Sequence, residues 1–169
     1  MKKLSETLNE LGIAFTFPIE IKGEHGNVTY HEDSDGLWGL REYDANGYQT
    51  YYEASDGDWC KYEYDGEGNL TYYEDSDGYW KKWEHDAKGN VTYYKESSDF
   101  WCKHEYDDNS NETYYEDSDG YWNKREYDAD GSLTYYENSW GCLEGTPRSQ
   151  SCDGKVIEVD GKKYKLTEI

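Results

Sequence analysis

Large aliphatic side chains are scarce in this chain of 169 residues. Leu, Ile, Val and Phe together number 21, about 12% of the sequence, and the formal net charge is -21. This combination is typical of disordered chains, because little apolar surface is available to offset the entropy of folding. Thirty aromatic residues, 20 of them tyrosine and 7 tryptophan, favour a folded protein instead, since each ring can bury a large area.

Long apolar runs are also missing. No stretch of about 18 apolar residues is present, so we expect no membrane span. The N-terminal sequence MKKLSETLNELG begins with two lysines, but Glu6 and Glu10 stand where a secretory signal has its apolar core. We therefore expect a cytoplasmic protein.

Cysteine is present four times, at Cys60, Cys102, Cys142 and Cys152, and never as a CxxC pair. This spacing argues against a zinc site. Thiols stay reduced in a cytoplasm, so free cysteines are the default expectation. Cys142 and Cys152 flank a short loop and would be able to pair in an oxidising compartment, which the sequence leaves open.

A 21-residue unit repeats about five and a half times, without a gap, between Gly26 and Gly141. One slot of the unit always holds tryptophan and another always holds glutamate: Trp38, Trp59, Trp80, Trp101 and Trp122, and Glu42, Glu63, Glu84, Glu105 and Glu126. Such a period is the signature of a repeat architecture. The chain therefore divides into an N-terminal cap (1–25), the repeats (26–141) and a C-terminal loop and hairpin cap (142–169).

Each unit contains two short runs of strand-forming residues, such as LTYYE from Leu70 to Glu74 and YWKKWEH from Tyr79 to His85. Turn residues separate them, and the last residue of most turns is a glycine, which tolerates a positive φ. The pattern predicts an all-β fold, an antiparallel β-meander of ten or eleven strands in an elongated, twisted and largely single-layer sheet. A narrow solenoid with parallel stacking is the alternative.

The odd period constrains the turns. A three-residue Ser-Asp-Gly turn and a four-residue Asp-Ala-x-Gly turn would advance the pairing by 21 residues and keep every side chain on its face. One face would carry Leu70, Tyr72 and Glu74 beside Trp80, Lys82 and Glu84; the other would carry Thr71 and Tyr73 beside Tyr79, Lys81, Trp83 and His85. Both faces mix aromatic and charged residues, so aromatic cross-strand pairs should hold the sheet together.

The ends of the chain have a different pattern. Lys3 to Leu11 predicts a short helix that stops at Gly12, and Ile13 to Ile21 predicts a strand interrupted by Pro18. After a loop with Pro147, the runs VIEV and KKYKLTEI flank Asp160-Gly161 and predict a hairpin. We expect these segments to cap the open edges of the sheet.

Nearly all of the negative charge belongs to the repeats. Residues 26–141 contain 29 acidic and 9 basic residues. Because the acids concentrate at the turns, a meander should present two parallel acidic rows about 20 Å apart. Their density approaches that of a nucleic acid, and such rows would repel nucleic acid and attract proteins that bind it. A solubility role against edge pairing explains the charge as well.

Other chemistries fit less well. The glutamate slot recurs five times, which favours structure over catalysis, so we expect no enzyme and no cofactor. Asp75, Asp77 and Glu84 match the back of a calcium-binding loop, but Tyr73 fills the first ligand slot, so we expect no metal site. Weak calcium binding by the turns, and sugar or choline binding by the aromatic slots, remain alternatives.

A family resemblance completes the sequence evidence. The phrase Glu-Tyr-Asp-x-x-Gly-Asn-x-Thr, found in variants at Tyr64-Asp65, Tyr106-Asp107 and Tyr127-Asp128, resembles the YD repeat of Rhs-type proteins, which has a similar period. The resemblance implies antiparallel β-structure over residues 26–141. The units here are more acidic and richer in tryptophan, and in this short acidic form they look like those of small proteins of phages or mobile elements of bacterial hosts. Choline- and glucan-binding repeats are similar more loosely.

We therefore expect an acidic, phage-encoded binding protein that inhibits a nucleic-acid-binding defence protein of the host. It would mimic a polyanion and occupy a basic protein surface of that partner. Direct binding to nucleic acid or membrane is not expected, and the sheet edges are compatible with a monomer or a dimer. The expected binding residues are Asp33, Asp35, Asp56, Asp75, Asp77, Asp117, Asp119, Glu74, Glu116, Trp38, Trp59, Trp80, Trp101 and Trp122.

Overall fold

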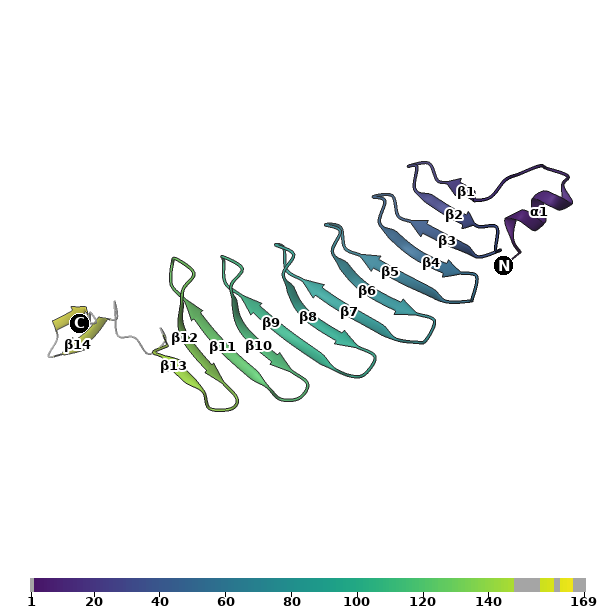
Figure 1. The fold of residues 1–169 in the computed structure, drawn as a ribbon. Helices are drawn as coiled ribbons and strands as arrows, with labels where there is room; N and C mark the ends of the chain where they lie inside the picture. The colour runs from purple at the N-terminus through teal and green to yellow at the C-terminus, as the bar shows by residue number, and fades with distance from the viewer. Residues whose placement is uncertain (1, 148–155, 160–161, 166–169) are drawn as a thin grey trace. The chain divides into compact units, whose positions relative to one another are not determined.

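Thirteen strands follow one another in chain order in one antiparallel sheet, and two further strands form a separate small sheet (Figure 1). The computed structural model describes residues 2–147, 156–159 and 162–165. They fall into two compact units, Met1–Trp101 and Cys102–Ile169. The chain order of the strands confirms the predicted meander and rules out the parallel solenoid for the described residues.

The first unit contains one helix and eight strands: α1 (Leu4–Glu10), β1 (Ile19–Lys22), β2 (Val28–Glu32), β3 (Trp38–Tyr43), β4 (Gln49–Ala54), β5 (Trp59–Tyr64), β6 (Leu70–Asp75), β7 (Trp80–His85) and β8 (Val91–Glu96). The second unit contains β9 (Trp101–Tyr106), whose first residue belongs to the first unit, β10 (Glu112–Asp117), β11 (Trp122–Tyr127), β12 (Leu133–Asn138), β13 (Leu143–Gly145), β14 (Val156–Val159) and β15 (Lys162–Lys165). Strands β2 to β12 are the eleven of the repeat region.

The N-terminal prediction was right for the helix and partly wrong for the strand. Helix α1 begins one residue after Lys3 and ends one residue before Leu11, the predicted limits. Gly12, with φ +68°, comes directly after Leu11. The strand begins at Ile19 instead of Ile13, because Pro18 fixes φ and lacks the N–H that a paired strand donates. Strand β1 then pairs with β2 through Ile19 and Glu32.

At the other end, the predicted hairpin is present as β14 and β15, with Val156 paired to Lys165. Asp160-Gly161 and the last four residues of KKYKLTEI lie outside the described residues, as does Cys152. The three-residue strand β13 was not predicted; it pairs with β12, with Leu143 opposite Glu137. Its short and glycine-ended sequence gives no strand signal of its own.

The turns at both edges of the sheet have the same length. Asp75 N–H donates to the Tyr79 carbonyl oxygen across the three-residue turn Ser-Asp-Gly, and Asp86 N–H donates to that of Asn90 across Ala-Lys-Gly. The predicted four-residue turn was therefore wrong. Gly78 and Gly89 have φ of +80° and +84°, as a three-residue hairpin turn with a left-handed last residue requires.

Each 21-residue repeat contains a β-bulge, which adds the one residue of pairing offset that the longer predicted turn was expected to add. The pairing shifts between Glu84 and His85, and corresponding shifts occur in the other units. Tyr72 pairs with Lys82, which pairs with Lys95, so aligned residues are 23 positions apart while equivalent residues are 21 apart. The predicted advance of 21 was wrong, but both numbers are odd, so equivalent residues keep the same face.

The two faces have the predicted mixed composition. Tyr72 lies opposite Lys82 and Glu74 opposite Trp80 on one face, while Tyr73 lies opposite Lys81 on the other. Ring pairs cross the strands, with centroids 5.5 Å apart for Tyr62 and Tyr73 and 5.7 Å for Trp83 and Tyr94. The buried large apolar residues among those described are few: Ile19, Tyr30, Trp38, Cys102 and Tyr135. Contacts between side chains of neighbouring strands, rather than an aliphatic core, therefore stabilise this sheet.

Two turns depart from the glycine rule and give a stability prediction. Asp99 and Ser110 hold the last turn position with φ of +69° and +64°. A left-handed backbone is costly for a side chain with a Cβ, and serine is less suited to it than aspartate. We expect Ser110→Gly to raise the free energy of unfolding by about 1 kcal/mol, measured by urea denaturation. Gly89→Ser should lower it by a similar amount, and no change in either variant would contradict the prediction.

Candidate functional site

The turns of the repeat carry most of the acidic side chains and almost no bases. Ten five-residue turns contain 18 acidic residues and one basic residue, Lys88. Five turns alternate with five on the opposite edge: 33–37, 54–58, 75–79, 96–100 and 117–121, and 44–48, 65–69, 86–90, 107–111 and 128–132. We call these the acidic turns; the first five, which include the Ser-Asp-Gly turns, are the first edge. Within each unit the expected acidic rows are therefore present.

The aspartate that opens a turn stabilises the turn itself. In the turn of residues 75–79, Asp75 Oδ1 accepts the N–H groups of Asp77 and Tyr79, both at 3.1 Å. Asp33 and Asp117 do the same in their turns. Aspartate favours this position because its short carboxylate reaches the backbone two residues ahead. These three predicted binding residues are half-buried and have a structural function.

On the opposite edge the opening aspartate accepts a side-chain amide in addition to backbone N–H groups. Asp65 Oδ2 accepts the side-chain amide of Asn69 at 2.9 Å, and Asp86 Oδ2 accepts that of Asn90 at 2.9 Å. These hydrogen bonds, supported by backbone N–H groups, lower the pKa of both carboxyl groups. Asp65 and Asp86 are therefore negatively charged throughout the neutral and mildly acidic range.

The middle aspartate of four first-edge turns is exposed to solvent. Asp35, Asp56, Asp77 and Asp119 are all exposed. Glu74 and Glu116 lie just inside the turns, directly opposite Trp80 and Trp122. The structure thus brings predicted acids and tryptophans together at the turns 75–79 and 117–121 of the first edge.

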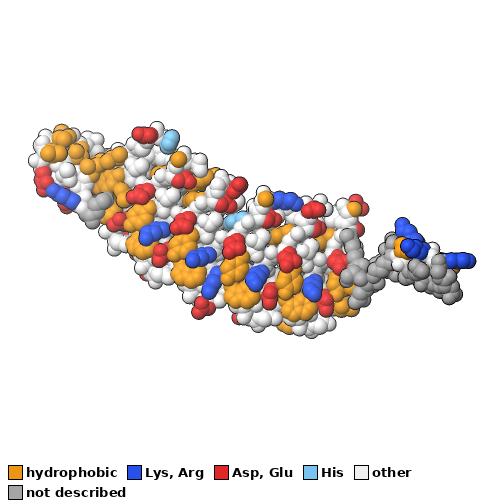
Figure 2. Space-filling view, turned by 180° about the vertical axis from the view of Figure 1, so that it is seen from behind, with side chains coloured by type: hydrophobic (Ala, Val, Ile, Leu, Met, Phe, Trp, Pro, Cys, Tyr) orange, Lys and Arg blue, Asp and Glu red, His pale blue; other side chains and the backbone are white. Residues whose placement is uncertain are grey.

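The basic residues of the strands lie in the middle of the sheet and against rings. Lys61 Nζ lies 4.9 Å from the centroid of the Trp59 ring, and Lys82 Nζ lies 5.5 Å from that of Trp80. Figure 2 shows Lys and Arg side chains set among hydrophobic and acidic ones on one face. Cation–π contact of this kind stabilises the charge without a carboxylate. An ion pair at a turn does occur between Lys95 and Asp99, at 3.7 Å and exposed.

The five predicted tryptophans differ in exposure. Trp38 is 8% exposed and stacks on Tyr30 with centroids 6.4 Å apart, so little of its ring is open to a partner. The other four are half-buried: Trp59, Trp80, Trp101 and Trp122. Lys124 Nζ lies 5.5 Å from the Trp122 ring, as in the other units. Trp59, Trp80 and Trp122 thus lie beside the acidic turns, each with a lysine ammonium group over the face of its ring.

Calcium ligands are not brought together by this geometry. Asp75 and Asp77 lie in the turn before β7, whereas Glu84 lies near the far end of that strand, opposite Tyr93. Among the residues that the structure describes, no group of three His, Cys, Asp or Glu side chains is placed to hold a metal ion. Within the same residues, no helix is long and apolar enough to cross a membrane.

The sequence did not reveal a buried carboxylate in the first unit. Glu32 is 0% exposed and accepts hydrogen bonds from Ser5 Oγ, from Ser5 N at 3.0 Å and from Tyr30 Oη at 2.9 Å. Burial raises the pKa of Glu32, but the hydrogen bonds together lower it by more than burial raises it. The pKa of Glu32 is therefore below its usual value. Because Ser5 belongs to α1, this carboxylate fastens the helix to the sheet.

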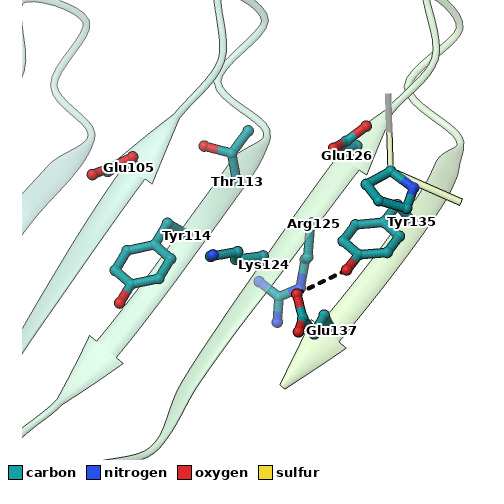
Figure 3. Close-up of a pocket in the computed structure, with 9 residues that line it drawn as sticks. Glu105, Thr113, Tyr114, Lys124, Arg125, Glu126, Tyr135 and Glu137 are labelled. Atoms are coloured by element: carbon teal, nitrogen blue, oxygen red, sulfur yellow. Dashed lines mark hydrogen bonds between the residues drawn. The ribbon is translucent and has the colours of Figure 1, made fainter. Parts of the chain in front are cut away.

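A shallow hollow of about 410 Å³ lies on the second unit (Figure 3). Glu105, Tyr114, Lys124 and Glu126 line it, and Tyr135 donates a hydrogen bond to Glu137 at 2.8 Å. Charges of both signs alternate across the strands. The hollow therefore suits polar contacts with a partner better than burial of an apolar ligand.

Comparison with known proteins gives structural neighbours only. No protein-family model matches the chain, and no curated protein matches it. The crystal structure of TcdB2–TccC3 superposes with a TM-score of 0.53 at 15% identity, over 70% of this chain and 7% of that one. A second structure of TcdB2–TccC3, without its hypervariable C-terminal region, gives 0.52 at 14% identity, over 80% and 8%.

The likeness is one of fold. At such low identity it supports the tandem antiparallel meander and carries no activity or partner across. This chain spans less than a tenth of the length of these neighbours.

Proposed function

We propose that this chain is a non-enzymatic protein that binds a basic surface of another protein through the first edge. The distribution of charge supports the proposal: acids fill the turns, Lys61 and Lys82 lie over tryptophan rings of the strands, and one strand lysine, Lys95, pairs with a turn carboxylate, that of Asp99. The carboxylates of the turns are therefore left to act outward, and the adjacent half-buried Trp and Tyr rings add contact area.

The spacing of the turns suits a partner that binds nucleic acid. Neighbouring turns on one edge are two strands and a two-residue offset apart, about 12 Å. With about two acids per turn, the two edges together display about one carboxylate per 3 Å, against about 1.7 Å per phosphate in duplex DNA. Such a row raises the association rate with basic surfaces and loses affinity as salt increases. Mimicry of a polyanion, as by a phage-encoded inhibitor of a host defence protein, is the specific form that we propose.

We also propose that the 21-residue unit is a short, acidic form of the YD repeat. The Glu-Tyr-Asp turn phrase supports this assignment, because its aspartate opens the turn and its tyrosine follows the bulge. Tyr64 in addition donates a hydrogen bond to the Gln49 carbonyl oxygen at 3.1 Å. The tyrosine and the aspartate thus each have a structural reason to recur.

Capture experiments with two charge-matched variants test the function. The first variant replaces the exposed turn aspartates with asparagine: Asp35, Asp56, Asp77 and Asp119. The control replaces four strand glutamates with glutamine: Glu42, Glu63, Glu84 and Glu105. Immobilised wild-type chain should capture basic nucleic-acid-binding proteins from a bacterial lysate, with duplex DNA competing. The turn variant should lose at least tenfold of this capture, and the control less than threefold.

Two results would count against the proposal. Equal losses in both variants would show that total charge, and not the turns, governs binding. Capture that resists an increase in salt or an excess of duplex DNA would remove polyanion mimicry as the mechanism.

A further inference from the structure

The second unit departs from the repeat at several slots that the fold does not require to change. Glu112 stands where the other 21-residue repeats have Val28, Gln49, Leu70, Val91 and Leu133. Trp140 stands where they have Asp35, Asp56, Asp77, Ser98 and Asp119, and Asn123 where they have Gly39, Cys60, Lys81 and Cys102. Because the 21-residue repeats otherwise agree, these departures single out this part of the chain for closer inspection.

These departures gather around one groove of about 380 Å³. Strands β9, β10 and β11 form it, and its lining residues are His104, Glu112, Tyr115, Tyr121, Asn123 and Arg125. Trp140 joins its rim, because its ring lies 4.6 Å from that of Tyr121, centroid to centroid. The groove belongs to the second unit alone and is separate from the hollow of Figure 3, apart from the shared Arg125.

The polar side chains of the groove are fixed in place. Glu112 Oε1 accepts a hydrogen bond from His104 Nδ1 at 2.7 Å, and Glu112 Oε2 accepts one from Arg125 Nη1. Burial lowers the pKa of His104, which keeps its ring neutral at pH 7. The guanidinium of Arg125 also lies 5.9 Å from the centroid of the Tyr136 ring. A preorganised set of donors and acceptors of this kind lowers the entropic cost of binding.

One acceptor in the wall of the groove lacks a donor. Asn123 is 3% exposed, and its Oδ1 atom has no hydrogen-bond partner among the described residues. A buried amide oxygen without a donor is costly, and native structures rarely leave one so. The atom is shielded from solvent, so a hydroxyl or amide N–H of a molecule bound in the groove would supply the missing donor once the Asn123 side chain turns into the groove.

The rim adds an aromatic platform. Trp140 is 81% exposed, the highest value among the exposed large hydrophobic residues of the described chain. An exposed ring beside fixed polar groups is the arrangement by which proteins recognise molecules with both apolar faces and hydroxyl edges. The net charge of -21 disfavours anionic ligands, so the ligand should be neutral.

We propose that this groove binds a single residue of a neutral sugar, stacked on Trp140 with a hydroxyl or acetamido N–H donated to Asn123. The site shares Tyr121 with the acidic turn 117–121, but it uses none of the exposed aspartates that serve the proposed protein binding. It also differs from the repeated tryptophan slots, because those rings are half-buried under lysines while Trp140 is open.

Titrations with defined sugars test the site in the full chain. The probes are glucose, N-acetylglucosamine, cellobiose and chitobiose, with glucuronate as the anionic comparison, each up to about 50 mM to detect weak binding. NMR follows the indole N–H of Trp140 and the side-chain amide of Asn123. At least one neutral sugar should shift both signals with saturation, and glucuronate should bind at least tenfold more weakly.

Matched variants complete the test. Trp140→Ala removes an exposed ring that the fold does not bury, and it should weaken sugar binding at least tenfold. Tyr48→Ala removes a comparable ring, 40% exposed and stacked on Tyr64 at 5.0 Å in the first unit, and should leave binding unchanged. The proposal is overturned if no neutral sugar shifts the signals, or if Trp140→Ala binds as well as the wild type.

Discussion

Replacing Glu32 with alanine is expected to lower the free energy of unfolding of the first unit by about 3 kcal/mol. Glu32 is fully buried and accepts three hydrogen bonds, two from Ser5 in α1 and one from Tyr30 in β2. Truncation leaves these donors without an acceptor and opens space beneath the helix. Urea denaturation followed by tryptophan fluorescence, together with the exchange rates of the α1 amides, measures the effect.

The equivalent residue of the next 21-residue repeat is the control for this prediction. Glu53 is half-buried and accepts a hydrogen bond from Tyr51 Oη at 3.2 Å, in the same geometry but without a helix above it. Glu53→Ala should therefore cost less than about 1 kcal/mol. Equal losses at the two positions would show that Glu32 does not fasten the helix.

The same contact should depend on pH in a known direction. The pKa of Glu32 is lowered from its ordinary value of 4.5, so folding favours the ionised form. Its contribution to stability is present above pH 4.5 and is lost as the pH falls through the lowered pKa. The difference in stability between the wild type and Glu32→Gln should accordingly shrink below pH 4, and a difference that stays constant would contradict the assignment.

The second large effect is expected at Glu112, where alanine should cost the second unit about 2 kcal/mol. Its carboxylate is 25% exposed and joins Arg125, 28% exposed, to His104, 18% exposed. Removing it leaves a largely buried guanidinium without its partner, while the remaining exposure moderates the cost. Thermal unfolding and the exchange rates of the β10 and β11 amides report the loss.

A neighbouring glutamate separates this effect from the loss of any charge. Glu105 lies on β9, is exposed and changes the net charge by the same amount. Glu105→Ala should change stability by less than about 0.5 kcal/mol. If Glu112→Ala were as mild, the cluster of His104, Glu112 and Arg125 would contribute little to the fold.

The sequence was sufficient to predict the fold because the repeat shows each signal several times. One Ser-Asp-Gly turn is weak evidence, but the recurrence of turn, Thr-Tyr-Tyr run and tryptophan at one spacing defines the strands and their order. The acidic rows followed from the same pattern, and the structure groups the predicted acids with Trp59, Trp80 and Trp122 at the first edge. The protein-binding function itself stays a prediction.

The remaining features depend on tertiary context. The bulge opposite Glu84 and His85 leaves no residue-type signal, because its extra residue, Thr92, belongs to the same Thr-Tyr-Tyr run that forms the strand. The burial of Glu32 depends on α1, which covers only the first unit. The groove at Asn123 was recognisable in principle, since Glu112 breaks an otherwise mainly apolar slot, but only the structure shows that Trp140 lies beside it.

The bulge also governs how such a chain can change in length. Two three-residue turns alone would advance the pairing by an even number, and the bulge makes the advance odd, like the period itself. Duplication or loss of a whole unit would thus preserve the sidedness of every strand that follows. Because each 21-residue repeat carries its own bulge, the chain can grow or shrink in steps of 21 residues while every side chain keeps its face.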